Sequence, residues 1–318
     1  MNTLYAVPNL FVKSALIKDK IIVELIHYAL FLIYKGIYEK TKSHANDAFD
    51  CYRVTIHILD YYRLHQNHKQ SLASNDYIRI KKAVDNGDFG TQHLVFLDPN
   101  EFVNVQLILE SADYFNGQLT LVFAKEFTDV FDYLKMRKEH HNSEAVRHLE
   151  LPVLMQLCNG YTKLDLAKVM QLKSTYAVKL YETVEAQYLY KEKKRSISSI
   201  NLKKLAFRLG MFDMNACISQ LYANTPICLS DVEFENQAEW RRMNNNILKP
   251  YIERINKICS TKYSFNRVTK EKLNFIYESD VVTAPKSEER KKKLKKSING
   301  FNNFNERNYD YDALTQSI

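Results

Sequence analysis

Apolar residues recur at helical spacing in the stretch 239–257, EWRRMNNNILKPYIERINK. On a helix, one broad stripe would hold Trp240, Met243, Ile247, Leu248, Tyr251 and Ile255. The opposite face would carry Arg241, Arg242, Asn245, Asn246 and Lys249. These residue types reach the edges of guanine and adenine or the phosphates of DNA. Taken alone, the stretch favours an ordinary amphipathic helix with a solvated face, because motifs of this length often match by chance.

In the N-terminal part, the apolar pattern predicts mainly helices. Apolar residues at helical spacing between 17 and 40 predict a central helix that is covered on most sides, and LFV at 10–12 predicts a short strand before it. The polar stretch 41–48 predicts a loop. The alternating β-branched residues of Cys51–Tyr62 favour a strand that leads into a short helix. A helix is predicted over Asn75–Asn86, where an Asn-Gly turn would end it.

Three short β-rich runs follow, separated by turn signals. They are His93–Asp98, Val103–Glu110 and Gln118–Phe123. A further helix is predicted over 124–142. Helices followed by hairpin strands are the order of a winged helix domain. Arg79 and Lys82, on the helix that precedes the strands, are the best candidates for DNA contact in this domain.

The C-terminal part predicts a second unit of the same kind. The stretch Tyr161–Gln187 predicts one or two helices, and Ser199 or Asn201 can cap a short helix that stops at Gly210. A polar insert then leads to the helix at 239–257. The runs KYSFNRV and KLNFIYE predict a hairpin, whose candidates for phosphate contact are Arg267, Lys270 and Lys272. A short helix, a turn, a longer helix and a hairpin indicate a winged helix.

Length and charge extend this picture. A chain of 318 residues suggests about two domains, and a net charge of +8 favours a polyanionic partner such as nucleic acid or an anionic membrane surface. We therefore expect an α+β, predominantly helical fold with two tandem winged helix domains. Residues 1–150 would form a DNA-binding domain, and 151–284 would be the main sequence-specific reader. Residues 285–318 would form a basic tail that is disordered, or a helix that orders on DNA.

The cysteines and the apolar runs indicate a cytoplasmic protein. The five cysteines are widely spaced and contain no CxxC pair, which is typical of reduced, mostly buried thiols. The most apolar run, 17–38, is interrupted by charged residues and by His27. It is therefore too polar for a membrane span, and we expect a buried helix and no contact with a membrane.

The sequence gives no sign of catalysis. His140 and His141 lie near Asp132 and Glu139, but adjacent histidines point in different directions on any regular element. A nickase would need alternating metal-binding histidines and a tyrosine nucleophile on a following helix. No nucleotide-binding loop or hydrolase motif is present either. We expect no catalytic residue, no metal site and no cofactor.

Three segments carry a resemblance to a known family. Leu172–Glu182, LKSTYAVKLYE, is similar to the family pattern LKSKYSxRLYELL. Ile200–Met211 is similar to IxLxELRxxLGI, and Trp240–Asn256 to WxxFKRRVLKPAIEEIN. The order of the segments and the spacing within each are kept. The chain thus resembles the plasmid replication initiators, the iteron-binding Rep proteins with two winged helices, closely over 160–280 and more loosely before residue 150.

The resemblance implies a bacterial protein that binds repeated double-stranded sequences at a plasmid origin as a monomer, through both winged helices. It also implies recruitment of the host replication initiator and helicase. Dimers formed through the first domain would repress the initiator's own gene. A winged-helix transcriptional repressor without a role in replication remains an alternative, and an origin-nicking endonuclease is a second one.

The chain departs from the family pattern in three places, one of which is the basic run Lys286–Lys296 in the tail. Asn244, Asn245 and Asn246 stand where the family has a basic triplet, so we expect a different base preference, because Asn pairs with adenine and Arg with guanine. The insert Phe212–Gln237 is longer than usual and could add an element. Lys173 and Lys179 fit either a solvated rim or phosphate contact. The residues expected in the core of the second domain are Trp240, Tyr176, Leu180, Tyr181 and Leu205.

Overall fold

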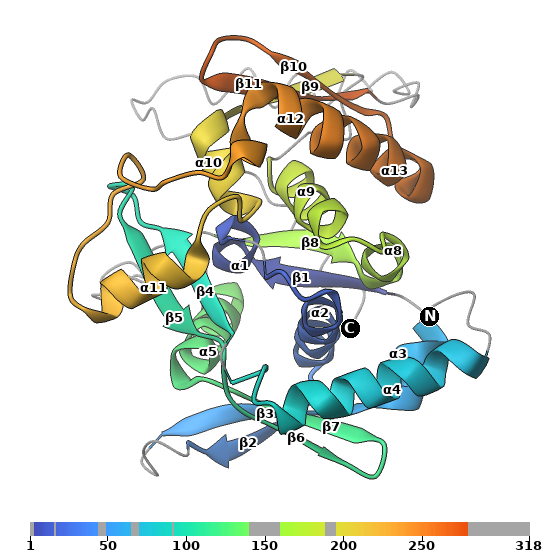
Figure 1. The fold of residues 1–318 in the computed structure, drawn as a ribbon. Coiled ribbons are helices and arrows are strands. Elements are labelled where there is room, and N and C mark those ends of the chain that lie inside the picture. Colours follow the sequence, from blue (N-terminus) through green and yellow to red (C-terminus); the bar gives the residue numbers. More distant parts are fainter. Residues whose placement is uncertain are drawn as a thin grey trace, which may run out of the picture. The chain divides into compact units, whose positions relative to one another are not determined.

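The computed structural model describes residues 3–15, 17–43, 49–64, 70–90, 92–139, 160–187 and 195–278. All of these residues belong to one unit, Met1–Ser279. Figure 1 shows a mixture of helices and small antiparallel sheets in this unit, which confirms the expected α+β composition. The predicted linker at 140–159 and the basic tail lie outside the described residues, so the division into domains stays a prediction.

A four-stranded antiparallel sheet with the order β2-β3-β7-β6 dominates the N-terminal part (Figure 1). Its strands are β2 (Glu39–Lys42), β3 (Asp50–His57), β6 (Leu109–Phe115) and β7 (Gln118–Phe123). On β3, Val54 and Ile56 are buried while Arg53 and His57 are exposed, as expected for a strand that covers a core on one face. The polar residues 41 and 42 form an edge strand and not the predicted loop.

The predicted central helix is α2 (Lys20–Tyr34), which contacts β3. Asp19 caps it, since its carboxylate accepts hydrogen bonds from the backbone N–H groups of Ile21 at 2.8 Å and Ile22 at 3.1 Å. Every residue from Ile21 to Ile33 is buried, so the helix is covered on all sides. Helix α5 (Lys125–Glu139) also contacts β3, and it confirms the prediction over 124–142.

The remaining N-terminal elements match the predicted order. They are α3 (Ile58–Leu64), α4 (Gln70–Asp85), β4 (His93–Leu97) and β5 (Val103–Leu107). Helix α4 begins earlier than predicted. The predicted strand over Val103–Glu110 is divided at Ile108 between two sheets, because β5 pairs with β4 and β6 pairs with β7.

The prediction of a strand at 10–12 is wrong. Strand β1 (Leu4–Pro8) ends at Pro8, and α1 (Asn9–Lys13) follows directly. A short run of buried apolar residues does not distinguish strand from helix.

Strand β1 pairs in antiparallel fashion with β8 (Tyr161–Asp165), with Leu4 opposite Asp165 and Pro8 opposite Tyr161. The sequence predicted a helix at β8, and the structure corrects this. Helices α8 (Leu166–Gln171) and α9 (Thr175–Ala186) follow and confirm two helices in this stretch. The β1–β8 ribbon therefore joins the first residues of the chain to the part beyond position 160.

The C-terminal part contains a three-stranded sheet with the order β10-β11-β9. Its elements are β9 (Arg195–Asn201), α10 (Leu202–Arg208), α11 (Met214–Tyr222), η1 (Asn236–Ala238), α12 (Trp240–Met243), η2 (Asn244–Leu248), α13 (Lys249–Cys259), β10 (Tyr263–Arg267) and β11 (Lys272–Glu278). The predicted hairpin is confirmed, and β9 is an additional strand. Asn201 caps α10, because its side-chain oxygen accepts from Lys203 N at 2.8 Å.

The insert at 212–237 adds helix α11 and a second apolar cluster. Phe212 stacks on Phe207, with ring centroids 4.8 Å apart, and Ile227 and Leu229 are buried. The backbone N–H of Val103 donates to the carbonyl of Ile227 at 2.8 Å. The insert thus packs on the β4–β5 hairpin and shares the second apolar cluster with it, which its polar sequence does not indicate.

The described cysteines and helices agree with the sequence expectations. Cys51, Cys217 and Cys259 are buried, and Cys228 is partly buried. Within the described part of the chain, the longest apolar helices are still too short or too charged to cross a bilayer.

Candidate nucleic-acid interface

Elements α12, η2 and α13 run consecutively from Trp240 to Cys259 and are here called the reading helix. Its inner face buries Met243, Ile247, Leu248, Ile252 and Ile255. Ile252 takes the place predicted for Tyr251, which is half-buried, because η2 is a π-helical turn and shifts the helical phase. The exposed residues of the outer face are Arg241, Arg242, Asn245, Asn246 and Lys249. The predicted polar face is therefore present.

The outer face has few contacts of its own. Arg242 Nε lies 3.8 Å from Glu239 Oε2, in an exposed pair. Asn244 is half-buried and donates from its amide nitrogen to the side-chain oxygen of Asn245 at 3.1 Å. Of the asparagine triplet, Asn245 and Asn246 are thus the members that face solvent.

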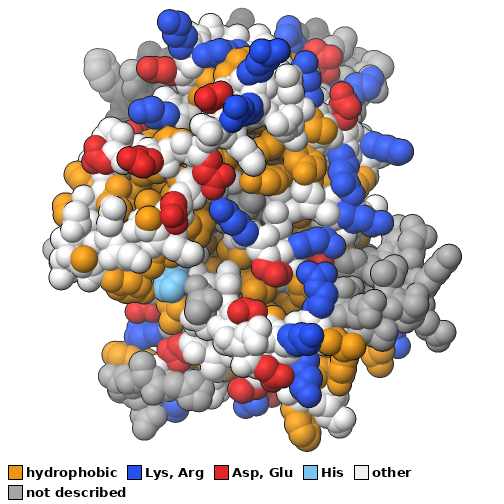
Figure 2. Space-filling view, viewed as in Figure 1, with side chains coloured by type: hydrophobic (Ala, Val, Ile, Leu, Met, Phe, Trp, Pro, Cys, Tyr) orange, Lys and Arg blue, Asp and Glu red, His pale blue; other side chains and the backbone are white. Residues whose placement is uncertain are grey.

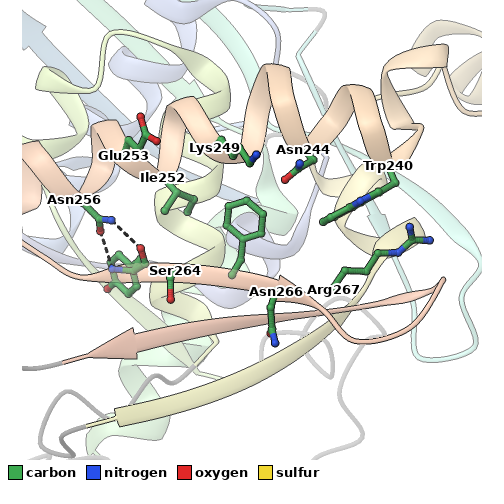
Figure 3. A pocket seen from close by; sticks show the side chains of 11 residues that line it. Trp240, Asn244, Lys249, Ile252, Glu253, Asn256, Ser264, Asn266 and Arg267 are labelled. Carbon is green, nitrogen blue, oxygen red and sulfur yellow. Dashed lines mark hydrogen bonds between the residues drawn. The ribbon is translucent and has the colours of Figure 1, made fainter.

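The end of the reading helix is joined to the hairpin by Asn256. Its amide nitrogen donates to the carbonyl of Tyr263, and its amide oxygen accepts from the N–H of Tyr263, both at 2.7 Å (Figure 3). The Tyr263 hydroxyl donates to Glu185 Oε1 at 2.6 Å. Burial and the neighbouring Glu185 carboxylate raise the pKa of Tyr263, so this hydroxyl keeps its proton. The Asn256 bonds hold the hairpin to the reading helix, and the bond between Tyr263 and Glu185 holds it to α9.

The hairpin of β10, the turn 268–271 and β11 is here called the wing. Lys270 and Lys272 are exposed on it. Arg267 donates from Nε to the carbonyl of Thr269 and from Nη2 to that of Lys270, both at 2.9 Å. Figure 3 shows the Arg267 side chain next to Trp240 at the start of the reading helix. The guanidinium carbon lies 5.1 Å from the Trp240 ring centroid.

A cleft of about 350 Å³ separates the reading helix from β10 (Figure 3). Apolar side chains, including Ile252 and Phe265, line it together with the polar groups of Asn244, Lys249 and Asn266. The helix and the wing therefore offer an open, polar-edged surface.

In the N-terminal part, Arg79 and Lys82 are exposed on α4, and buried Ile80 anchors the same helix. Figure 2 shows Lys and Arg side chains in a band along one side of this face, from the level of α13 to that of α4.

The structure excludes both roles that the sequence allowed for Lys179. Lys179 is only 3% exposed, donates to the carbonyl of Phe11 at 3.0 Å and pairs with Glu182 at 2.8 Å. It belongs to the core and contacts neither solvent nor DNA. Lys173 is exposed in the turn between α8 and α9.

Three of the residues predicted in the core are buried, namely Leu180, Tyr181 and Leu205. Tyr176 and Trp240 are only half-buried. Tyr176 stacks on Tyr251, with ring centroids 6.1 Å apart. These rings cover the edge of the core beside the reading helix.

Sequence reasoning missed Asn256 as a site residue. It lies inside the third family-like segment, one turn before the end of the reading helix, and its amide offers one donor and one acceptor. An asparagine near a helix end followed by a strand was the available signal. The sites of His140 and His141 lie outside the described residues, and the described residues contain no cluster of three or more His, Cys, Asp or Glu suited to a metal.

The chain matches the model of a known protein family. Residues 30–185 match the family model described as Initiator Replication protein, WH1, a winged helix domain. The matched part includes the four-stranded sheet, α4 and the β4–β5 hairpin, and it continues through α9. No curated protein matches the chain.

Proposed function

Because the chain belongs, through residues 30–185, to the plasmid replication initiator family, we propose that it initiates replication by binding repeated sequences in double-stranded DNA at a plasmid origin. The polar face of the reading helix is the observation that carries this proposal. Its arginines, asparagines and lysine are exposed on a helix whose opposite face is buried, so they are free to enter a major groove.

The wing and α4 would supply the other DNA contacts. Lys270 and Lys272 are exposed on the wing and suit phosphates, which orient a protein without reading sequence. The three-stranded sheet, α10 and the reading helix would together form a second winged helix. Arg79 and Lys82 on α4 would contact the same DNA from the first winged helix, so that one chain reads a long site.

Family membership supports the remaining steps of the proposed function. After binding, the protein would recruit the host replication initiator and helicase to the origin. Dimers formed through the first domain would repress the gene of the initiator itself. The protein would act without a catalytic step of its own in the bacterial cytoplasm.

Footprinting on the DNA next to the gene tests the proposal. The full chain is expected to protect tandem direct repeats spaced by about two helical turns. Arg241→Ala should lose this protection at concentrations at which the wild type is saturated. Absence of protection by a folded wild-type chain would overturn the proposal.

Two further assays separate the alternatives. A plasmid whose only origin is the adjacent DNA should replicate when the chain is supplied; protection of the repeats without replication would indicate a repressor. Supercoiled origin DNA incubated with the chain and Mg²⁺ should stay intact. A covalent tyrosyl adduct would identify a nickase instead.

A further inference from the structure

We propose that Arg267 positions the wing of the DNA reader and does not itself bind a phosphate, so that Lys270 and Lys272 make the wing's DNA contacts. This inference rests on the proposed function and revises the role expected for Arg267 from sequence. It follows from three sets of contacts that hold the turn of the wing in one conformation.

The first set is the hydrogen-bonded fork of Arg267. Its Nε and Nη2 donate to the carbonyls of Thr269 and Lys270 at 2.9 Å each. Two parallel donors in a rigid plane match two carbonyls of one turn, and a lysine ammonium does not reproduce this geometry. One of the two carbonyls belongs to Lys270 itself. The fork therefore sets the orientation of the backbone that carries the Lys270 side chain.

The second contact joins the wing to the reading helix. The guanidinium carbon of Arg267 lies 5.1 Å from the ring centroid of Trp240, the first residue of α12 (Figure 3). Trp240 is half-buried and packs on the main apolar cluster, so its ring has a fixed place. A cation over an aromatic face is attracted by the negative charge of that face. Arg267 thus links the tip of the wing to the helix that carries Arg241 and Arg242.

The third set fixes the far side of the turn. The N–H of Leu202, at the start of α10, donates to the carbonyl of Glu271 at 2.7 Å. Within the turn, Val268 N donates to Lys272 O at 2.8 Å, and Glu271 N donates to Thr269 Oγ1 at 3.2 Å. The turn is therefore tied to α10 on one side and, through Arg267, to α12 on the other.

These contacts give the three cations of the wing different roles. Arg267 is itself exposed, but two of its donors bind backbone carbonyls of the turn, and its guanidinium lies over the Trp240 ring. Lys270 and Lys272 extend from the turn that Arg267 holds, and both are exposed. An ammonium on a flexible stem makes the point-charge contact that a phosphate accepts. The charge of Arg267 contributes to the electrostatic potential of the wing, but the hydrogen bonds of its guanidinium hold the turn in its conformation.

Fluorescence of the full chain without DNA gives the first test. Trp240 is the only tryptophan of the 318 residues, so its emission reports its own surroundings. Arg267→Lys keeps the charge and loses the fork, and we expect a shifted emission and stronger quenching by acrylamide. Lys270→Ala is the matched control and should leave both unchanged. Unchanged emission in folded Arg267→Lys would overturn the inference.

The salt dependence of DNA binding gives the second test. If Arg267 contacted a phosphate, Arg267→Lys would keep that contact and the slope of log K against log salt. The positioning role predicts a shallower slope, by up to about 0.9 for each displaced lysine contact. Lys270→Ala should then cost less affinity in the Arg267→Lys background than in the wild type. The positioning role would be rejected if Arg267→Lys left the salt slope unchanged and if the affinity losses of Arg267→Lys and Lys270→Ala simply added.

A second variant tests the positioning role of Arg267 without changing any cation of the wing. Trp240→Leu removes the ring under Arg267, and it too should make the salt slope shallower. A direct phosphate contact by Arg267 predicts the wild-type slope for this variant. If the wild-type chain binds no DNA, the proposed function fails, whereas the fluorescence of Trp240 still decides whether Arg267 holds the wing.

Discussion

The Nε2 atom of His27 lies 2.8 Å from Oε1 of Glu182, and the two side chains are 0% and 2% exposed. This contact joins α2 to α9 in the interior. The second oxygen of Glu182 pairs with Lys179 at 2.8 Å, and the Tyr5 hydroxyl lies 2.6 Å from Nδ1 of His27. Burial and the nearby Glu182 raise the pKa of Tyr5, so its hydroxyl keeps the proton that it can donate to His27.

Breaking this buried cluster from one side should destabilise the fold strongly. Lys179→Met leaves Glu182 buried without its ammonium partner, and we expect a loss of about 3 to 5 kcal/mol in the free energy of unfolding. Urea denaturation followed by circular dichroism measures it. Lys173→Met, at an exposed lysine of the neighbouring turn, should change stability by no more than about 0.5 kcal/mol.

The double variant Lys179→Met/Glu182→Leu provides the control for the charge. Removing both charges takes away the unpaired carboxylate, so a large part of the lost stability should return. If the double variant is as unstable as the sum of the two single ones, then packing and not charge explains the effect of Lys179→Met.

The same cluster predicts a dependence of stability on acid. Burial tends to raise the pKa of Glu182, but the charge of Lys179 and the contact with His27 outweigh it and leave the pKa below the ordinary 4.5. A lowered pKa stabilises the folded state above pH 4.5, and this contribution is lost as the pH falls through the lowered value. Urea unfolding between pH 7 and pH 3 should therefore show that the free energy of unfolding falls more steeply with pH for the wild type than for Glu182→Gln. An equal fall in unfolding free energy with pH for the two proteins would contradict a lowered pKa of Glu182.

Elements whose pattern is local were predictable from the sequence. The helix around Leu25 and Ile26 shows its period directly, and the wing shows alternation in both strands and a turn between them. Strands β1, β8 and β9 were missed or assigned to other elements. Each is short, and its partner is remote in sequence, as in the pairing of Pro8 with Tyr161 or of Asn201 with Lys272.

In the candidate site too, local patterns were predictable from the sequence and contacts between remote segments were not. The polar face with Arg241 and Asn245 could be read from helical spacing, because exposure on one face is a local property. The burial of Lys179 could not, since it depends on α1, where the Phe11 carbonyl accepts its hydrogen bond, and on His27 of α2, which contacts Glu182. The fork of Arg267 was equally hidden, because its acceptors are backbone carbonyls that no side-chain pattern indicates.

The insert should behave as part of the core, although its sequence is polar. Phe212 is 0% exposed and stacks on Phe207, so Phe212→Ala is expected to cost about 3 to 5 kcal/mol of unfolding free energy. Thermal and urea unfolding measure the loss. Gln220→Ala, on the exposed side of α11, should stay near the wild type. A small effect of Phe212→Ala would mean that this second apolar cluster adds little to stability.

The reading helix should separate base contacts from phosphate contacts by mutation. Arg241→Ala or Arg242→Ala removes a side chain suited to guanine and should cost about 1 to 3 kcal/mol on the specific site, with reduced discrimination against scrambled DNA. Lys270→Ala removes a phosphate contact, so it should weaken specific and scrambled DNA alike and reduce the salt slope by about 0.9. Anisotropy titrations with both duplexes at several salt concentrations measure these quantities. Equal losses on the two duplexes for Arg241→Ala would show that this arginine binds the backbone, and the reading of sequence would then rest on Asn245, Asn246 and Lys249.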